Sequence, residues 1–166
     1  ADANQLLESI KGYQFKYASD IIPSDKKIQA EILYNKYDIF KNLFLYYFLA
    51  GLLFFVFIIL NIFSENKLIN NFMKYIIIIF RSSIVVLFIA HTFGLIARWY
   101  ISGHAPWGDA YESMIYVAWA TMGIGLLFIK KSDLTLASTS FVTSMILMIA
   151  HWNWMDPSIA NLVPVL

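Results

Sequence analysis

One uncharged, mostly apolar run dominates the sequence: Leu43-Phe-Leu-Tyr-Tyr-Phe-Leu-Ala-Gly-Leu-Leu-Phe-Phe-Val-Phe-Ile-Ile-Leu-Asn-Ile-Phe63. A helix rises about 1.5 Å per residue, and the apolar core of a membrane is about 30 Å thick. A helix over residues 43–63 is therefore long enough to cross that core. The run predicts a transmembrane helix.

Three more apolar stretches follow and predict further transmembrane helices. They cover residues 75–99, 113–129 and 134–152. The last is rich in serine and threonine, whose small hydroxyl side chains permit close helix packing. No strand-like alternation competes with this pattern. We therefore expect an all-α fold, a polytopic membrane bundle of four transmembrane helices.

Composition supports a membrane protein and excludes several other classes. The chain has 166 residues, of which 60% are hydrophobic and 14% charged, whereas soluble domains average about 45–50% apolar and about 25% charged residues. A formal net charge of +1 without a basic stripe argues against a nucleic-acid partner. Because cysteine is absent, the strong nitrogen donors available to a metal are His91, His104 and His151.

Residues 1–42 differ from the rest, because they carry about half of the charged side chains. Pro23-Ser24-Asp25 predicts a break, with Ser24 capping a helix over 25–42 that runs into the membrane. Residues 1–22 are expected to form a surface helix or the remnant of an extramembrane domain. We thus divide the chain into an extramembrane amphipathic helical segment, 1–42, and a transmembrane portion, 43–166. Since it begins without methionine, we expect a fragment of a longer protein.

The connecting loops predict a topology. Lysines occur in the loop Ser64–Lys74 and at Lys130-Lys131, whereas Ile101–Glu112 contains neither lysine nor arginine. The positive-inside rule places the first two loops in the cytoplasm, and the loop 101–112 and both chain ends outside. Lys36 and Lys41 oppose this assignment.

Residues able to do chemistry are concentrated between His91 and Ser113. The stretch holds two histidines, one arginine, two tryptophans and two tyrosines, together with Asp109 and Glu112. Aromatic rings pack on a flat apolar ligand, arginine pairs with carboxylates, and a neutral imidazole binds iron. The set fits a planar, amphipathic, anionic ligand, and heme has all three features.

Each of these side chains also has an ordinary role in a membrane protein. Arginine and tryptophan anchor helices at the interface, a carboxylate favours a helix N-terminus, and a histidine bonds to a neighbouring helix or remains free in a loop or at the interface. These interpretations stay open for Arg81 and Arg98, Trp99 and Trp107, Glu112, His91, His104, and His151 with Trp152, Trp154 and Asp156 behind it.

A longer pattern resembles a known family. The run Arg98-Trp99-Tyr-Ile-Ser-Gly103-His104-Ala-Pro106, followed by Tyr111-Glu112-Ser113 and Ala118-Trp119, is similar to cytochrome c biogenesis proteins of the CcsA/ResC type, in the tryptophan-rich heme-handling superfamily. Ala30–Lys36 resembles the fused CcsBA form, and Leu162–Leu166 looks like the segment before that family's next membrane helix. One departure is Gly108-Asp109, where many relatives carry Ser-Asn.

The resemblance implies a heme-handling function. Such proteins export heme across the bacterial inner membrane and promote its attachment to apocytochrome c, a heme lyase-like activity. It implies heme b as ligand, and apocytochrome c, the remaining portion of the synthase and the lipid membrane as partners. The chain lacks the family's tryptophan-rich motif with its external histidines, so no catalytic residue and no metal ligand is assigned.

The same resemblance implies a set of residues that shape the outer heme site. In this hypothesis Arg98 either meets a heme propionate or fixes the loop through Glu112, and Trp107 lies against the porphyrin or the lipid. A transporter for another substrate and a structural subunit without heme are the alternatives. The predicted heme-site residues are Arg98, Trp99, His104, Trp107, Tyr111 and Glu112.

Overall fold

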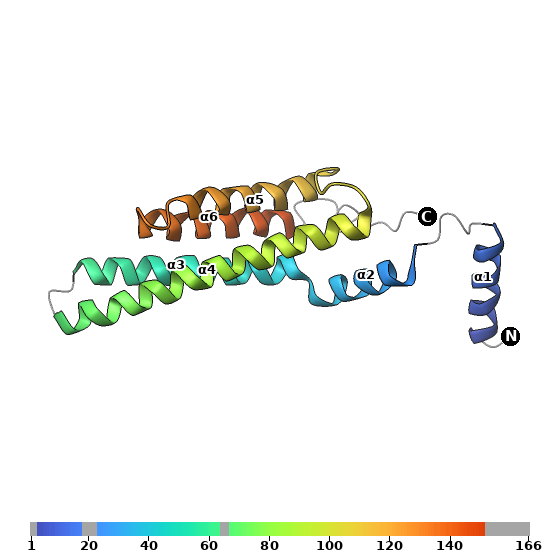
Figure 1. Cartoon of the computed structure of the whole chain (residues 1–166), viewed down its shortest axis with the longest axis horizontal. Coiled ribbons are helices and arrows are strands. Elements are labelled where there is room, and N and C mark those ends of the chain that lie inside the picture. Colours follow the sequence, from blue (N-terminus) through green and yellow to red (C-terminus); the bar gives the residue numbers. More distant parts are fainter. Residues whose placement is uncertain (1–2, 18–22, 64–66, 152–166) are drawn as a thin grey trace.

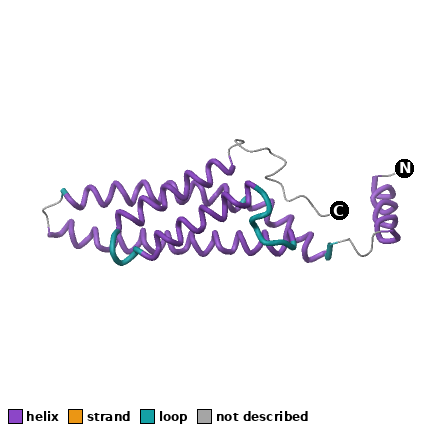
Figure 2. Tube along the Cα trace, turned by 90° about the horizontal axis from the view of Figure 1, so that it is seen from above, coloured by secondary structure: helices purple, strands orange, loops and turns teal. Residues whose placement is uncertain are grey.

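The computed structural model describes residues 3–17, 23–63 and 67–151, and within these ranges it contains helices and short connections but no strand (Figure 1). The expected all-α class is confirmed. Figures 1 and 2 show the helices α3 (Ile39–Ile62), α4 (Lys67–Ser102), α5 (Ala110–Leu127) and α6 (Asp133–His151) extending along one common axis.

The N-terminal part forms two shorter helices. The first, α1 (Ala3–Tyr17), exposes every residue. In the second, α2 (Asp25–Tyr37), Ser24 occupies the expected N-cap position but makes no side-chain capping hydrogen bond. Its carbonyl oxygen accepts from the backbone N–H groups of Lys27 and Ile28 at 2.8 and 3.1 Å.

The prediction of one continuous helix over 25–42 is wrong, because the chain breaks at Asp38. This residue adopts the left-handed conformation (φ 39°, ψ 59°), and its N–H donates to the carbonyl oxygen of Tyr34 at 3.2 Å. Aspartate tolerates this region better than most residues, since its short polar side chain bonds locally. A new helix, α3, then begins at Ile39.

Three segments of the described chain are long and apolar enough to cross a membrane, namely Asp25–Ile62, Phe72–Ser102 and Asp133–His151. They indicate a multi-pass membrane protein. The span expected at 113–129 is present as the helix α5 but is not among these three. The helix α5 has 18 residues, and Glu112 in its first turn lowers its mean hydropathy.

The bundle is held together by close contacts of α6 with α3 and α5. A Cβ atom on Gly51 of α3 would lie 2.8 Å from the backbone nitrogen of Phe141, so the two helix backbones almost touch. The hydroxyl of Ser140 in α6 donates a hydrogen bond to the carbonyl oxygen of Tyr47 in α3 at 3.0 Å. The predicted role of small hydroxyl residues in close packing is confirmed here.

Arg81 joins two helices instead of only extending to a membrane surface. Its Nε donates to Oδ1 of Asp133 at 2.7 Å, and the two side chains are 33% and 24% exposed. The pair ties α4 to the first residue of α6. It lies toward the end of the bundle that holds the α5–α6 connection, whereas the α4–α5 connection lies at the other end (Figure 1).

Candidate functional site

The loop of residues 103–109 is fixed at both of its ends. Gly103 takes a positive φ of 77°, and its N–H donates to the carbonyl oxygen of Trp99 at 2.9 Å, which closes α4. Glycine suits this left-handed helix end because it has no Cβ. Asp109 caps α5, since its Oδ1 accepts from the N–H of Glu112 at 2.6 Å.

A buried ion pair crosses beneath this loop. The Nε of Arg98 donates to Oε1 of Glu112 at 2.8 Å, and the two side chains are only 2% and 1% exposed. The other carboxylate oxygen, Oε2, accepts from the N–H of Gly108 at 2.8 Å. Glu112 thereby links α4, α5 and the loop. Arg98 is not an exposed surface anchor, and its contact matches the expected fixing of the loop through Glu112.

Aromatic rings enclose the Arg98 guanidinium. Its Cζ lies 4.9 Å from the centre of the Tyr111 ring, a cation–π distance, and Tyr111 is buried. Tyr34 of α2 lies beside the same guanidinium. The Tyr34 hydroxyl is buried and has no hydrogen-bond partner among the described residues. Arg98 of α4 therefore lies between residues of α2 and α5.

His104 lies on the outside of the loop. Its side chain is 57% exposed, and its Nδ1 is 3.0 Å from the carbonyl oxygen of Ala105 and 3.9 Å from Oε2 of Glu112. Ser102 donates to the carbonyl oxygen of His104 at 3.0 Å. No group of three or more His, Cys, Asp or Glu in the described ranges is arranged to hold a metal ion.

An apolar pocket of about 280 Å³ opens between the loop, α4 and α5. Trp99 and Trp107 form part of its wall and are 56% and 63% exposed. Tyr116 packs against two other aromatic residues of the wall. Its ring centre lies 5.8 Å from that of Trp107 and 5.7 Å from that of Trp119. Of the six predicted residues, Trp99 and Trp107 face this pocket, whereas the buried Arg98 and Glu112 support the loop above it.

Sequence reasoning did not single out Tyr116 and quoted Trp119 only as part of a motif. Their spacing of three residues was a usable signal, because such residues lie on one face of a helix. The indole N–H of Trp119 donates to Oγ1 of Thr92 at 2.9 Å, and the Thr92 hydroxyl donates to the carbonyl oxygen of Phe88 at 2.9 Å. The polar atoms at the back of the pocket are thus paired with each other.

The three histidines lie at separate places. His91 is fully buried, and its Nε2 lies 3.1 Å from the carbonyl oxygen of Ile115, which confirms its expected hydrogen bond to a neighbouring helix. His151 ends α6 and lines a second pocket of about 350 Å³, together with Asp38 and Tyr111. The predicted interface residues Trp152, Trp154 and Asp156 lie outside the described residues.

Comparison with known proteins relates the chain to cytochrome c biogenesis proteins. No protein-family model matches it. Over 98% of its length it is 38% identical to protein NrfI of Wolinella succinogenes, of which it covers 18%. It is 36% identical over 66 residues to the cytochrome c biogenesis protein CcsA of Lotus japonicus, with 38% of this chain and 20% of that protein aligned. The tomato CcsA (Solanum lycopersicum) is 38% identical over 58 residues, covering 34% of this chain and 18% of that protein. In each case the matched part of the chain covers about a fifth of the length of the curated relative.

Proposed function

We propose that this chain is part of a membrane-embedded cytochrome c synthase of the fused CcsBA type, in which it forms one wall of the outer heme site. The complete protein carries heme across the bacterial inner membrane and promotes its attachment to apocytochrome c. Similarity to NrfI along nearly the whole chain and to CcsA along a third of it supports this assignment. In this proposal the loop 101–112 and both chain ends lie on the outer side.

The observation that carries the proposal is the aromatic pocket beside a rigid loop. Trp99, Trp107 and Tyr116 present apolar ring surface, which suits the flat apolar faces of a porphyrin. The pocket volume of about 280 Å³ is close to the lower limit, about 300 Å³, of typical ligand sites. It therefore accommodates one edge of the ring, and the rest of the heme site comes from the remaining portion of the synthase.

Arg98 acts in this proposal as a positioning residue. Its side chain is 2% exposed and already paired with Glu112, so a heme propionate reaches the guanidinium only if that pair opens. Fixing the loop places Pro106 and Trp107 against the pocket. We assign the same supporting role to Tyr111, whose ring covers the guanidinium.

Heme is the transported substrate in this proposal, and no role as an iron ligand is assigned to His91, His104 or His151. In this proposal the thiols to which heme is attached belong to apocytochrome c. The residues of this chain contribute, in the same proposal, an apolar aromatic surface and a loop fixed by hydrogen bonds.

The test is heme retention by the full-length protein carrying Trp99→Ala and Trp107→Ala together. We expect the heme content, measured by the pyridine hemochrome assay, and cytochrome c maturation both to fall several-fold at unchanged expression. Phe93→Ala is the matched control, since Phe93 is an exposed aromatic residue of α4 outside the pocket. Equal heme contents in both variants would exclude the pocket as a heme surface. A full-length protein without heme, even beside apocytochrome c, would exclude the function.

A further inference from the structure

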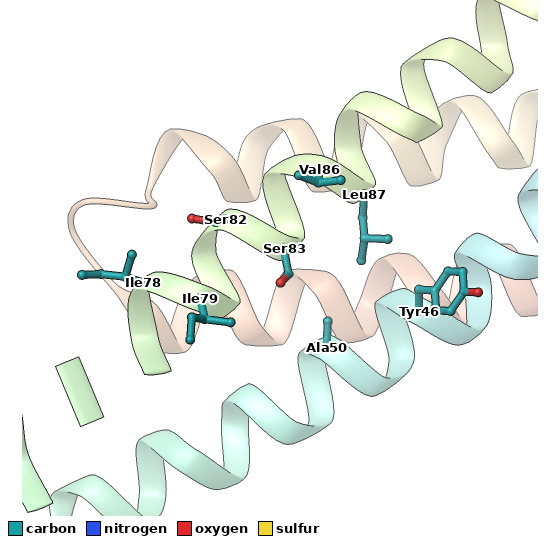
Figure 3. Close-up of a pocket in the computed structure, with 8 residues that line it drawn as sticks. All are labelled: Tyr46, Ala50, Ile78, Ile79, Ser82, Ser83, Val86 and Leu87. Atoms are coloured by element: carbon teal, nitrogen blue, oxygen red, sulfur yellow. The ribbon is translucent and has the colours of Figure 1, made fainter. Parts of the chain in front are cut away.

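A polar cavity lies where α2 meets α3 and where α6 ends. It has a volume of about 350 Å³, and its polar lining residues are Tyr34, Asn35, Asp38, Tyr111 and His151. The groove between α3 and α4 is different, because it is lined mainly by aliphatic side chains, which lipid chains can cover (Figure 3). Lipid chains cannot pair with the polar atoms of the cavity, so water or a polar ligand must fill it.

Asp38 brings to this cavity a carboxylate without a counter-ion. Among the described side chains, no nitrogen of lysine, arginine or histidine lies within 4.0 Å of the Asp38 carboxylate. The left-handed backbone at this position (φ 39°) does not require the charge, since asparagine also tolerates the left-handed region. The carboxylate is thus available to a positively charged ligand.

The rest of the lining favours an ammonium group as that ligand. Tyr34 has a hydroxyl without a hydrogen-bond partner among the described residues, and a hydroxyl oxygen accepts from an N–H group. The rings of Tyr34, Phe40 and Tyr111 also line the cavity, and aromatic faces attract cations. Arg98 does not supply this cation, because it is paired with Glu112 and does not line the cavity.

The cavity lies at the level of one membrane surface. Asp38 precedes the start of the uncharged run at Leu43 by about 7.5 Å of helix, and His151 ends the apolar helix α6. Asn35 in the lining is exposed, so the cavity is open to its surroundings. One water molecule takes up about 30 Å³ in the liquid, so the cavity accommodates a small organic group and not only a single ion. Lipid headgroups occupy this level of a membrane.

We propose that this cavity binds the primary ammonium group of an ethanolamine lipid headgroup. Asp38 neutralises the ammonium charge, and the Tyr34 hydroxyl accepts one of its N–H groups. A choline headgroup pairs less well, because its nitrogen carries no N–H group. A lysine side chain has the same ammonium chemistry, but lipid headgroups surround this level of the bundle at all times, which favours the lipid as the source.

The experiment is native mass spectrometry of the delipidated full-length protein, titrated with phosphatidylethanolamine or phosphatidylcholine that carry the same acyl chains. These lipids have equal net charge and differ in the N–H groups. We expect the first phosphatidylethanolamine to bind about fivefold more tightly, since one hydrogen bond contributes about 1 kcal/mol. Asp38→Asn, which keeps the backbone conformation, should abolish this preference, and Tyr34→Phe should weaken it. Glu31→Gln is the matched control, since Glu31 is a half-buried carboxylate of α2 outside the cavity, and should retain the preference.

Four results would overturn the proposal. They are equal binding of the two lipids, a preference that survives in Asp38→Asn, a preference that Glu31→Gln also removes, and a preference that soluble ethanolamine at equal concentration abolishes. The last result would reject the lipid as the source of the ammonium group. The measurement requires neither heme nor apocytochrome c, so its outcome is independent of the proposed function.

Discussion

Replacing either partner of the Arg98–Glu112 pair should destabilise the protein strongly. Both side chains are almost fully buried, at 2% and 1% exposure, and their atoms meet at 2.8 Å. Removing one partner of a buried pair costs about 3–5 kcal/mol, because a charge is left in an apolar environment without compensation. We expect about 3 kcal/mol or more for Arg98→Met. For Glu112→Gln we expect a smaller loss in the free energy of unfolding, about 2 kcal/mol, because the amide oxygen of glutamine still accepts one hydrogen bond.

The two changes together should cost less than their sum. The double variant replaces both charges by neutral groups of similar size, so no buried charge remains unpaired. We expect a coupling free energy of about 2 kcal/mol, within the range of about 0.5–3 kcal/mol seen for residues in contact. The measurement is the free energy of unfolding of the full-length protein in mixed detergent micelles, made for the original protein, both single variants and the double variant.

The Arg81–Asp133 pair provides the matched control. Its atoms are even closer, at 2.7 Å, but the side chains are 33% and 24% exposed. A partly exposed pair contributes at most about 1 kcal/mol, so the cycle of Arg81→Met and Asp133→Asn should give a smaller coupling. Additive effects at Arg98 and Glu112, within about 0.5 kcal/mol, would refute the reasoning that burial makes this pair strong.

Three further variants test individual contacts of the fold, each by the same unfolding measurement. Gly51→Val should cost about 1–3 kcal/mol, because its side chain would be forced against the backbone of α6; a neutral effect would mean that α3 and α6 are not in close contact. Gly103→Ala should cost about 1 kcal/mol, since its φ of 77° is unfavourable for alanine, and an unchanged stability would argue against the left-handed end of α4. Asp109→Ala should cost about 1 kcal/mol by removing the cap of α5, whereas Asp109→Asn should retain most of it; equal losses in the two would show that the cap is not the cause.

The fold class could be predicted because a helix that crosses a membrane needs an apolar segment of a length set by the thickness of the membrane. The helix expected at residues 43–63 appears as α3, and the one expected at 134–152 appears as α6, each close to its predicted ends. The break at Asp38 could not be predicted in this way. Neither glycine nor proline marks it, and the apolar pattern continues through Phe40, so the sequence favoured a helix that the backbone interrupts.

The sequence indicated some members of the candidate site but not their arrangement. Arg98, Trp99 and Glu112 lie in a short stretch rich in charged and aromatic residues, and the family resemblance assigned them to the outer heme site. Sequence alone left open which partner Arg98 takes, since that depends on α4 and α5 folding back on each other across the loop. The contribution of Tyr116 to the pocket was missed because its three-residue spacing from Trp119 indicates a shared helix face but does not show which neighbour that face meets.

The paired polar atoms behind the aromatic pocket bear on how the proposed ligand would be held there. The Thr92 hydroxyl donates to Phe88 and accepts from Trp119, so it has little capacity left for a guest molecule. A flat molecule on this wall is retained by contact area and dispersion, without a directional bond. Such a surface sets no preferred rotation of the ring in its own plane. Sliding off it would break no hydrogen bond, which fits the transfer of heme that we propose better than its permanent binding.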